Sequence, residues 1–123
     1  MGKTTVVQIE LFRNETEFER FSAGATIFRE GEPGQLMYVV LEGEVRLSVK
    51  GVEVDLLGPG GVMGEMSLID AAPRSATATA VTDCKLVPIT ERRFMFMVQQ
   101  TPKFALQIMR VIADRLRAMD KRL

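Results

Sequence analysis

Hydrophobic and polar residues alternate through the middle of the chain. In the run VRLSVK (45–50) every second residue is apolar, and the run VEVDL (52–56) repeats the pattern. A period of two predicts β-strands with one face in the core and the other in water. Lys50 and Gly51 separate the runs and predict a tight hairpin, because glycine supplies the positive φ that such turns need. The residues expected to face the core are Val45, Leu47, Val49, Val52, Val54 and Leu56.

Glycines divide the chain from Phe18 onward into short runs of β-branched and aromatic residues. Two more strands are expected at 75–81 and 84–89. Short strands with turns at this spacing are typical of an all-β barrel or jelly roll. We therefore expect a mainly β fold, a double-stranded β-helix (jelly-roll) barrel over about residues 18–89. Before it, the run VVQIELF (6–12) favours a short helix or strand.

The pattern changes after Pro88. The run ERRFMFMVQQ (91–100) favours a helix, and Thr90 before it is a suitable N-cap. Pro102 ends this helix and opens another one. The barrel is thus followed by two α-helices over about residues 90–123. With 123 residues and 46% hydrophobic content, the whole chain is interpreted as a single domain with one core.

Apolar residues of the second helix form a seam. Its intervals of four and three residues fit either packing on the core or a dimer interface with a second copy of the chain. On an adjoining face, Phe104, Ile108 and Val111 are expected to pack on the barrel. The seam residues are Ala105, Met109, Ile112, Leu116, Met119 and Leu123.

The net charge and the hydropathy of the chain argue against two classes of binding partner, nucleic acids and membranes. Sixteen basic and sixteen acidic residues give a formal net charge of zero without a long like-charge run, which disfavours direct nucleic-acid binding. No apolar run approaches the roughly 20 residues that span a bilayer, and the opening run MGKTTVVQIE lacks the apolar region of a signal peptide. We expect a cytoplasmic protein that binds neither DNA nor membranes.

The chain contains no histidine and a single cysteine, Cys84. The usual general base and the commonest metal ligand are therefore both missing. This excludes a Ser-His-Asp triad, a histidine-ligated haem and a histidine-bound metal, and one cysteine cannot build an iron–sulfur or structural zinc site. We expect no enzyme, no metal and no cofactor, and we interpret Cys84 as a small core residue.

The loop GGVMGEMSLIDAAPRSATATA (60–80) holds the residues best suited to a ligand. A short helical turn over 65–69 would expose backbone N–H groups, which favour an anion. Arg74 offers a planar donor fork for phosphate oxygens, whereas Glu65, which only accepts hydrogen bonds, suits a sugar hydroxyl. A cyclic phosphodiester on a ribose presents both demands, and its one negative charge matches a single arginine.

Two runs resemble the cyclic-nucleotide-binding domain family, which includes bacterial catabolite activator proteins and the regulatory subunits of cyclic-AMP-dependent protein kinase. GEMSLIDAAPRSATATA (64–80) is similar to the family's phosphate-binding cassette, and Arg74 follows Glu65 by nine residues, as in the kinase-type cassette. Upstream, AGATIFREGEPGQLMYVVLEGEVRL (23–47) resembles the glycine-paired opening of the family's barrel.

The resemblance implies a role for each cassette residue. Glu65 would accept from the ribose 2′-hydroxyl of a cyclic nucleotide, Arg74 would pair with its phosphate, and the final helix would close over the base as a lid. Met119 and Asp120 occupy the region where catabolite activators contact adenine. The cradle would be completed by backbone groups of Gly64, Met66, Ser67, Ser75 and Ala76.

Three departures from the family pattern affect these expectations. Met63 replaces the usual phenylalanine before the GE pair, the N-terminal helical bundle is mostly absent, and Met119 with Asp120 replaces the hydroxyl side chains that contact adenine. Ser75, which could serve the phosphate or the base, leaves cyclic AMP and cyclic GMP both open, with cyclic AMP preferred.

Two other functions remain alternatives to a cyclic-nucleotide sensor. The barrel could be an interaction module that binds no nucleotide, or the chain could be a fragment of a catabolite-activator-type transcription regulator.

Overall fold

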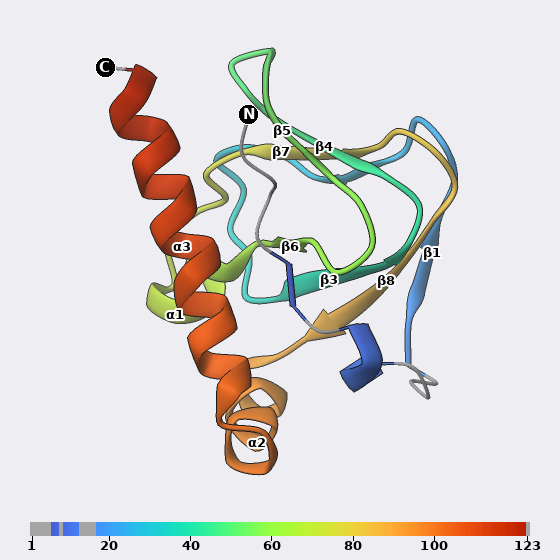
Figure 1. The fold of residues 1–123 in the computed structure, drawn as a ribbon. Coiled ribbons are helices and arrows are strands. Elements are labelled where there is room, and N and C mark those ends of the chain that lie inside the picture. Colours follow the sequence, from blue (N-terminus) through green and yellow to red (C-terminus); the bar gives the residue numbers. More distant parts are fainter. Residues whose placement is uncertain (1–5, 8, 13–16, 123) are drawn as a thin grey trace.

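In the part of the chain that the structure describes, two antiparallel sheets and three α-helices make up the fold (Figure 1). The computed structural model describes residues 6–7, 9–12 and 17–122, except the side chains at 9–10 and 119–122. One sheet has the strand order β1-β8-β3-β6 and the other β2-β7-β4-β5. The elements are η1 (Ile9–Phe12), β1 (Glu19–Phe21), β2 (Thr26–Phe28), β3 (Met37–Glu42), β4 (Val45–Val49), β5 (Val52–Leu57), β6 (Val62–Met63), α1 (Glu65–Asp70), β7 (Thr77–Ala80), β8 (Cys84–Ile89), α2 (Glu91–Gln100) and α3 (Lys103–Arg122).

This architecture confirms the predicted jelly roll with C-terminal helices. Between the sheets lies one apolar cluster, to which β4 contributes Val45 and Leu47 and β8 contributes Leu86. Cys84 also lies in this cluster, as expected of a small core residue. The short N-terminal element is a 3-10 helix, one of the two forms that the run 6–12 favours.

A second apolar cluster lies on the outer side of the first sheet. Phe104, Ile108 and Val111 of α3 are buried there against residues of β3 and β8, which confirms the predicted packing face of the final helix. Because β3 is covered on both sides, four consecutive residues, 37–40, are buried in it. Burying a large apolar side chain such as Phe104 contributes about 1.5–3 kcal/mol, so this cluster fixes where α3 lies.

The predicted hairpin between β4 and β5 is confirmed at its turn, but two of the residues of β5 that were predicted to face the core do not do so. Lys50 and Gly51 both have positive φ, 51° and 80°. However, Val52 is 66% exposed and Leu56 is 44% exposed, so the expectation that both face the core is wrong. The pairing of β4 with β5 shifts register between Leu47 and Ser48. Such a bulge reverses which side of a strand faces inward, and Leu57 enters the core in place of Leu56.

The two C-terminal helices begin where the sequence predicts. The Thr90 hydroxyl accepts a hydrogen bond from the backbone N–H of Arg93 at 3.1 Å, so Thr90 is the N-cap of α2. After Pro102, α3 runs along one side of the sandwich and passes α1 (Figure 1). This path brings the final helix next to the loop that carries Glu65 and Arg74.

Candidate functional site

The predicted cassette forms a connection between the two sheets, from β6 through α1 to β7. Gly64 joins β6 to α1 with a φ of 79°, a left-handed conformation that favours glycine. After α1, the Ser67 hydroxyl donates to the carbonyl oxygen of Ala72 at 2.7 Å. This hydrogen bond closes the loop onto its own helix, so the Ser67 side chain serves the cassette's shape.

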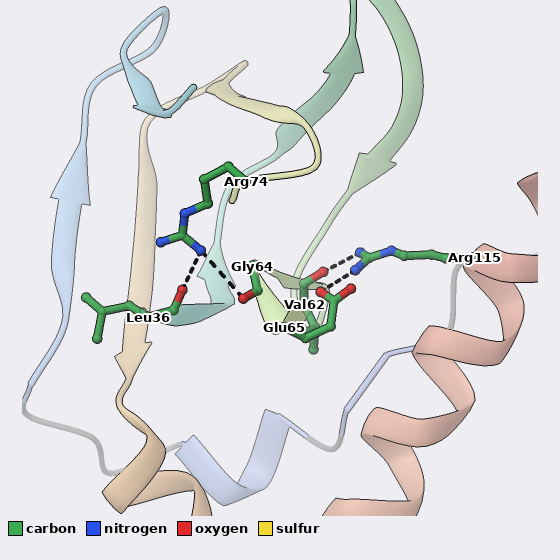
Figure 2. Close-up of polar contacts among 6 residues, drawn as sticks. All are labelled: Leu36, Val62, Gly64, Glu65, Arg74 and Arg115. Carbon is green, nitrogen blue, oxygen red and sulfur yellow. Dashed lines mark hydrogen bonds and ion pairs between the residues drawn. The ribbon is translucent and has the colours of Figure 1, made fainter. Parts of the chain in front are cut away.

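Arg74 lies in the centre of this connection and is only 6% exposed. Its Nη1 donates to the carbonyl oxygen of Leu36 at 2.7 Å and, more weakly, to that of Gly64 at 3.5 Å (Figure 2). Its Nε is buried without a hydrogen-bond partner. Among the described residues Arg74 forms no ion pair. The guanidinium therefore keeps both an unused donor and an unneutralised charge.

The backbone around Arg74 is tied to the loop between β2 and β3. Gly31 N–H donates to the Arg74 carbonyl at 2.8 Å, and Arg74 N–H donates to the Glu32 carbonyl at 2.9 Å. Gly34 lies so close that a Cβ there would come within 2.3 Å of Arg74 Nε. Burial lowers the pKa of Arg74 below its ordinary value, while Tyr38, Glu32 and Glu65 act in the opposite direction. The group remains a cation at neutral pH, because the guanidinium of arginine does not lose its proton in proteins.

Glu65 is the other buried charged residue of the cassette, with 4% exposure. Its Oε1 accepts from Nη1 of Arg115 on α3 at 2.5 Å (Figure 2). Nη2 of Arg115 also donates to the carbonyl oxygen of Val62. Glu65 and Arg74 lie on either side of Gly64 in Figure 2, so the site presents an acceptor and a donor at the same turn.

The sequence analysis missed Arg115. Positions 104, 108, 111 and 115 recur at helical spacing, and the residues at the first three form the apolar face that packs on the barrel. The sequence therefore places Arg115 on the same face of the helix. A charged residue continuing such a face must find a buried partner or leave the face. Glu65, the charged residue at the start of α1, is that partner.

The other predicted site residues are distributed around this pair. Gly64 provides the left-handed turn, and the side chain of Met66 is exposed. Ser75 follows Arg74 and is exposed, whereas Ala76 is buried in the core between the sheets. The side chains of Met119 and Asp120 lie outside the described residues. The structure thus brings together Gly64, Glu65 and Arg74, and adds Arg115.

The arrangement suits recognition of a small anionic ligand. Arg74 offers a donor and a positive charge, and Glu65 offers a carboxylate that only accepts. Among the residues that the structure describes, no group of three or more cysteine or acidic side chains is placed to hold a metal ion. Within the same part of the chain, no helix is long and apolar enough to cross a membrane.

Comparison with known proteins decides the family. The sequence model of the cyclic nucleotide-binding domain matches residues 18–101, which contain the whole site except Arg115. The chain belongs to the cyclic nucleotide-binding domain family. The matched residues include the loop 60–80, on which Glu65 and Arg74 were predicted, and α3 lies beyond them.

Individual relatives of this cyclic nucleotide-binding domain agree in fold. The cyclic AMP receptor protein of Thermus thermophilus is 35% identical over 118 residues, which are 92% of this chain and 55% of the relative. The crystal structure of the Thermus thermophilus catabolite activator protein has a TM-score of 0.76 and 32% identity, over 91% of this chain and 60% of that one.

One further structural neighbour is associated with cyclic GMP instead of cyclic AMP. A solved structure from a cyclic-GMP-dependent signalling pathway that regulates bacterial phytopathogenesis has a TM-score of 0.76 and 27% identity, over 89% of this chain and 91% of that one. By contrast, this chain spans about half the length of the curated relatives it matches. The likeness to those relatives therefore extends to their nucleotide-binding part, and the activity of the whole proteins does not follow from it.

Proposed function

We propose that the chain is a cytoplasmic sensor domain that binds a cyclic nucleotide at Glu65 and Arg74 and carries out no catalysis of its own. The observation that supports this proposal most strongly is the buried Nε of Arg74, which lacks an acceptor. A buried donor without a partner costs free energy, which an incoming acceptor recovers. In the proposed complex a phosphate oxygen is that acceptor.

The charge of the ligand fits the same group. Arg74 has no ion pair among the described residues, and a cyclic phosphodiester carries one negative charge. Binding therefore pairs one cation with one anion and leaves no surplus charge in the buried site. A linear nucleoside monophosphate carries more negative charge at neutral pH and lacks the ring, so we expect it to bind more weakly.

In the proposed complex Glu65 accepts from the ribose 2′-hydroxyl. A carboxylate has about four acceptor positions on its two oxygens, and Arg115 contacts only Oε1. Glu65 therefore has capacity for a sugar hydroxyl beside the ion pair. The backbone groups proposed to complete the cradle belong to Gly64, Met66, Ser67, Ser75 and Ala76.

Access to the site involves the final helix. Glu65 and Arg74 are both almost inaccessible, and Arg115 attaches α3 to Glu65. We infer that a ligand enters when the part of α3 around Arg115 moves away from the cassette and that the helix closes again over the base. Such a movement would carry the signal of nucleotide binding to a partner.

Cyclic AMP is the ligand we propose, with cyclic GMP as the alternative. The Thermus relative is named a cyclic AMP receptor, whereas a structural neighbour comes from a cyclic-GMP-dependent pathway. Met119 and Asp120 are the predicted base contacts on α3. A carboxylate at Asp120 would accept from the exocyclic amine of adenine, whereas guanine presents a carbonyl oxygen at that position. Replacement of Asp120 by alanine should narrow the affinity gap between the two nucleotides.

The outer face of α3 supports a second copy of the chain as the partner. Met109 and Leu116, two residues of the predicted seam, are each more than half exposed, and Leu106 lies beside them. Exposed apolar stripes of this kind are usually covered in the working assembly. We propose a homodimer in which two α3 helices pack along this face.

Isothermal titration calorimetry with cyclic AMP, cyclic GMP and linear AMP tests the proposal. The folded chain should bind both cyclic nucleotides, with cyclic AMP the tighter, and should bind linear AMP more weakly. Glu65→Gln should cost about 1.5–3 kcal/mol in affinity, since it removes a charged acceptor, and should make a 2′-deoxy analogue little worse than the parent nucleotide. A folded chain that binds neither cyclic nucleotide would instead support an interaction module without a ligand.

A further inference from the structure

A buried arginine without a carboxylate partner needs another source of stabilisation. Removing a cation from water costs several kcal/mol unless other groups compensate it. The two carbonyl oxygens that contact Nη1 of Arg74 supply part of this compensation. The remaining contact is aromatic, because the guanidinium carbon lies 4.2 Å from the centroid of the Phe28 ring. At that distance the electron-rich face of the ring attracts the cation.

Phe28 is itself held firmly. It ends β2, where its backbone is paired with Ala78 of β7 in antiparallel register. The Phe28 ring is stacked with Tyr38 of β3, with ring centroids 6.3 Å apart and planes inclined by 27°. Both rings are buried in the cluster between the sheets. The platform under Arg74 is therefore a two-ring stack that reaches from one sheet to the other.

An aromatic partner leaves hydrogen-bond donors and charge of Arg74 free that an acidic partner would occupy. A carboxylate would take up the donor fork of Arg74 and neutralise its charge, so that an anionic ligand would have to displace it. A ring face attracts the cation without accepting any N–H group in its plane. This difference agrees with the unpartnered Nε of Arg74.

We propose that Phe28, supported by Tyr38, is a positioning residue that holds the Arg74 guanidinium in the orientation for an anionic ligand while leaving its Nε–H group and its charge available. The inference rests on the proposed function, because it concerns the group that receives the phosphate. Phe28 thus contributes to ligand affinity, in addition to the stability that its burial in the core between the sheets provides.

Two substitutions separate positioning from packing. Phe28→Leu keeps an apolar side chain but removes the ring face, and Phe28→Tyr restores it. We expect Phe28→Leu to weaken cyclic AMP binding by about 3- to 30-fold and Phe28→Tyr to recover most of the loss, the range that follows from a desolvated cation–π contact. Val45→Ala is the matched control, because Val45 is buried in the same cluster and has no ring face to offer Arg74. It should lower stability to urea and leave cyclic AMP affinity unchanged.

A spectroscopic measurement tests the geometry without any ligand. The ring current of Phe28 should shift the Nε–H proton resonance of Arg74 upfield in the free protein, and Arg74→Lys identifies that resonance by removing it. The shift should disappear in Phe28→Leu and persist in Phe28→Tyr. An unshifted resonance in the wild-type protein would overturn the inference even if Phe28→Leu failed to fold.

The two proposals fail in different ways. A wild-type chain that binds no cyclic nucleotide overturns the proposed function and this inference together. A wild-type chain that binds cyclic AMP, with unchanged affinity in folded Phe28→Leu, overturns the positioning role alone. Equal losses in Phe28→Leu and Val45→Ala would do the same, since they would trace the effect to packing.

Discussion

Arg115 on the final helix donates to the carboxylate of Glu65 at the start of α1, with Nη1 and Oε1 2.5 Å apart although the two residues are 50 positions apart in the sequence. This ion pair joins the two parts of the domain that are expected to change on ligand binding. The Glu65 side chain is almost fully buried, whereas that of Arg115 is one quarter exposed. Glu65 is therefore the partner that depends more on the pair.

A double-mutant cycle on this pair should show strong coupling. Arg115→Gln leaves the buried carboxylate of Glu65 without its cation, so it should destabilise the protein. In Glu65→Gln/Arg115→Gln no charge is left uncompensated, and the double variant should be less destabilised than the sum of the single ones by about 0.5–3 kcal/mol. Urea unfolding of the four proteins gives the coupling free energy. Simple additivity would mean that the two residues do not interact in solution.

Removal of the Arg74 side chain should reduce affinity without unfolding the domain. We expect Arg74→Ala to weaken cyclic AMP binding by about 2–5 kcal/mol, the usual cost of deleting one member of a desolvated charge pair. Arg74→Lys should recover only part of this, because lysine lacks the planar fork. Calorimetric titration measures both, with Arg110→Ala at an exposed position of α3 as the charge-matched control. An unchanged dissociation constant in Arg74→Ala would refute the phosphate assignment.

Gly34→Ala should act on the site through Arg74. The added Cβ would lie within 2.7 Å of three atoms of the guanidinium group, all of them in a side chain that can move aside. We therefore expect weaker cyclic AMP binding with little loss of stability to urea. Gly58→Ala is the control, since a Cβ at Gly58 meets nothing within 4 Å. If Gly34→Ala binds as tightly as the control, the close packing around Arg74 plays no part in recognition.

The proposed dimer can be broken at Leu116. Leu116→Glu introduces a charge into the apolar face of α3, so it should lower the association constant and, if the helix is coupled to the site, weaken cyclic AMP binding as well. Val52→Glu places the same charge on the equally exposed hairpin and should leave association unchanged. Sedimentation velocity over a range of concentrations measures both. A wild-type chain that stays monomeric with and without nucleotide would exclude this dimer.

Stability should fall at alkaline pH, in part because of Cys84. Burial raises the pKa of its thiol above the ordinary value of about 8.5. Above that pH the unfolded chain has lost the thiol proton while the folded chain still holds it, so the free energy of unfolding decreases as pH rises. Burial also raises the pKa of Tyr38, which acts in the same direction at higher pH. Cys84→Ala should flatten the decline above about pH 8.5, as urea unfolding at each pH would show; an unaltered slope would contradict this account.

Local patterns in the sequence predicted the elements that depend on local physics. The alternation of β4, the turn at Lys50 and Gly51, and the N-cap Thr90 each depend on neighbouring residues. The bulge opposite Leu47 depends on how β4 and β5 pair, and alternation carries no information about such a register shift. The predicted core face of β5 is therefore correct at Val54, which packs against the cluster between the sheets, and wrong at Val52 and Leu56.

The candidate site likewise contains some residues that the sequence predicted and others that it could not predict. Glu65 and Arg74 lie nine residues apart in one motif, so the sequence could place them together. The Leu36 carbonyl and the Phe28 ring reach Arg74 from another loop and another strand, and no spacing rule links them to it. Arg115 was visible only as a charge at an apolar position of a helix. Contacts of this kind are set by how the sheets and helices pack.

The helix α2 packs on the domain through partly buried side chains: Phe94, Met97 and Val98 lie against the second apolar cluster, and the rings of Phe94 and Phe104 have centroids 5.5 Å apart. None of its ten residues is fully buried, whereas Ile89 before it and Phe104 after it are completely so. Elements with few buried contacts open first in hydrogen-exchange measurements, so amides of α2 should exchange well before those of β3. The connection from β8 to α3 should therefore open more readily than the sandwich itself.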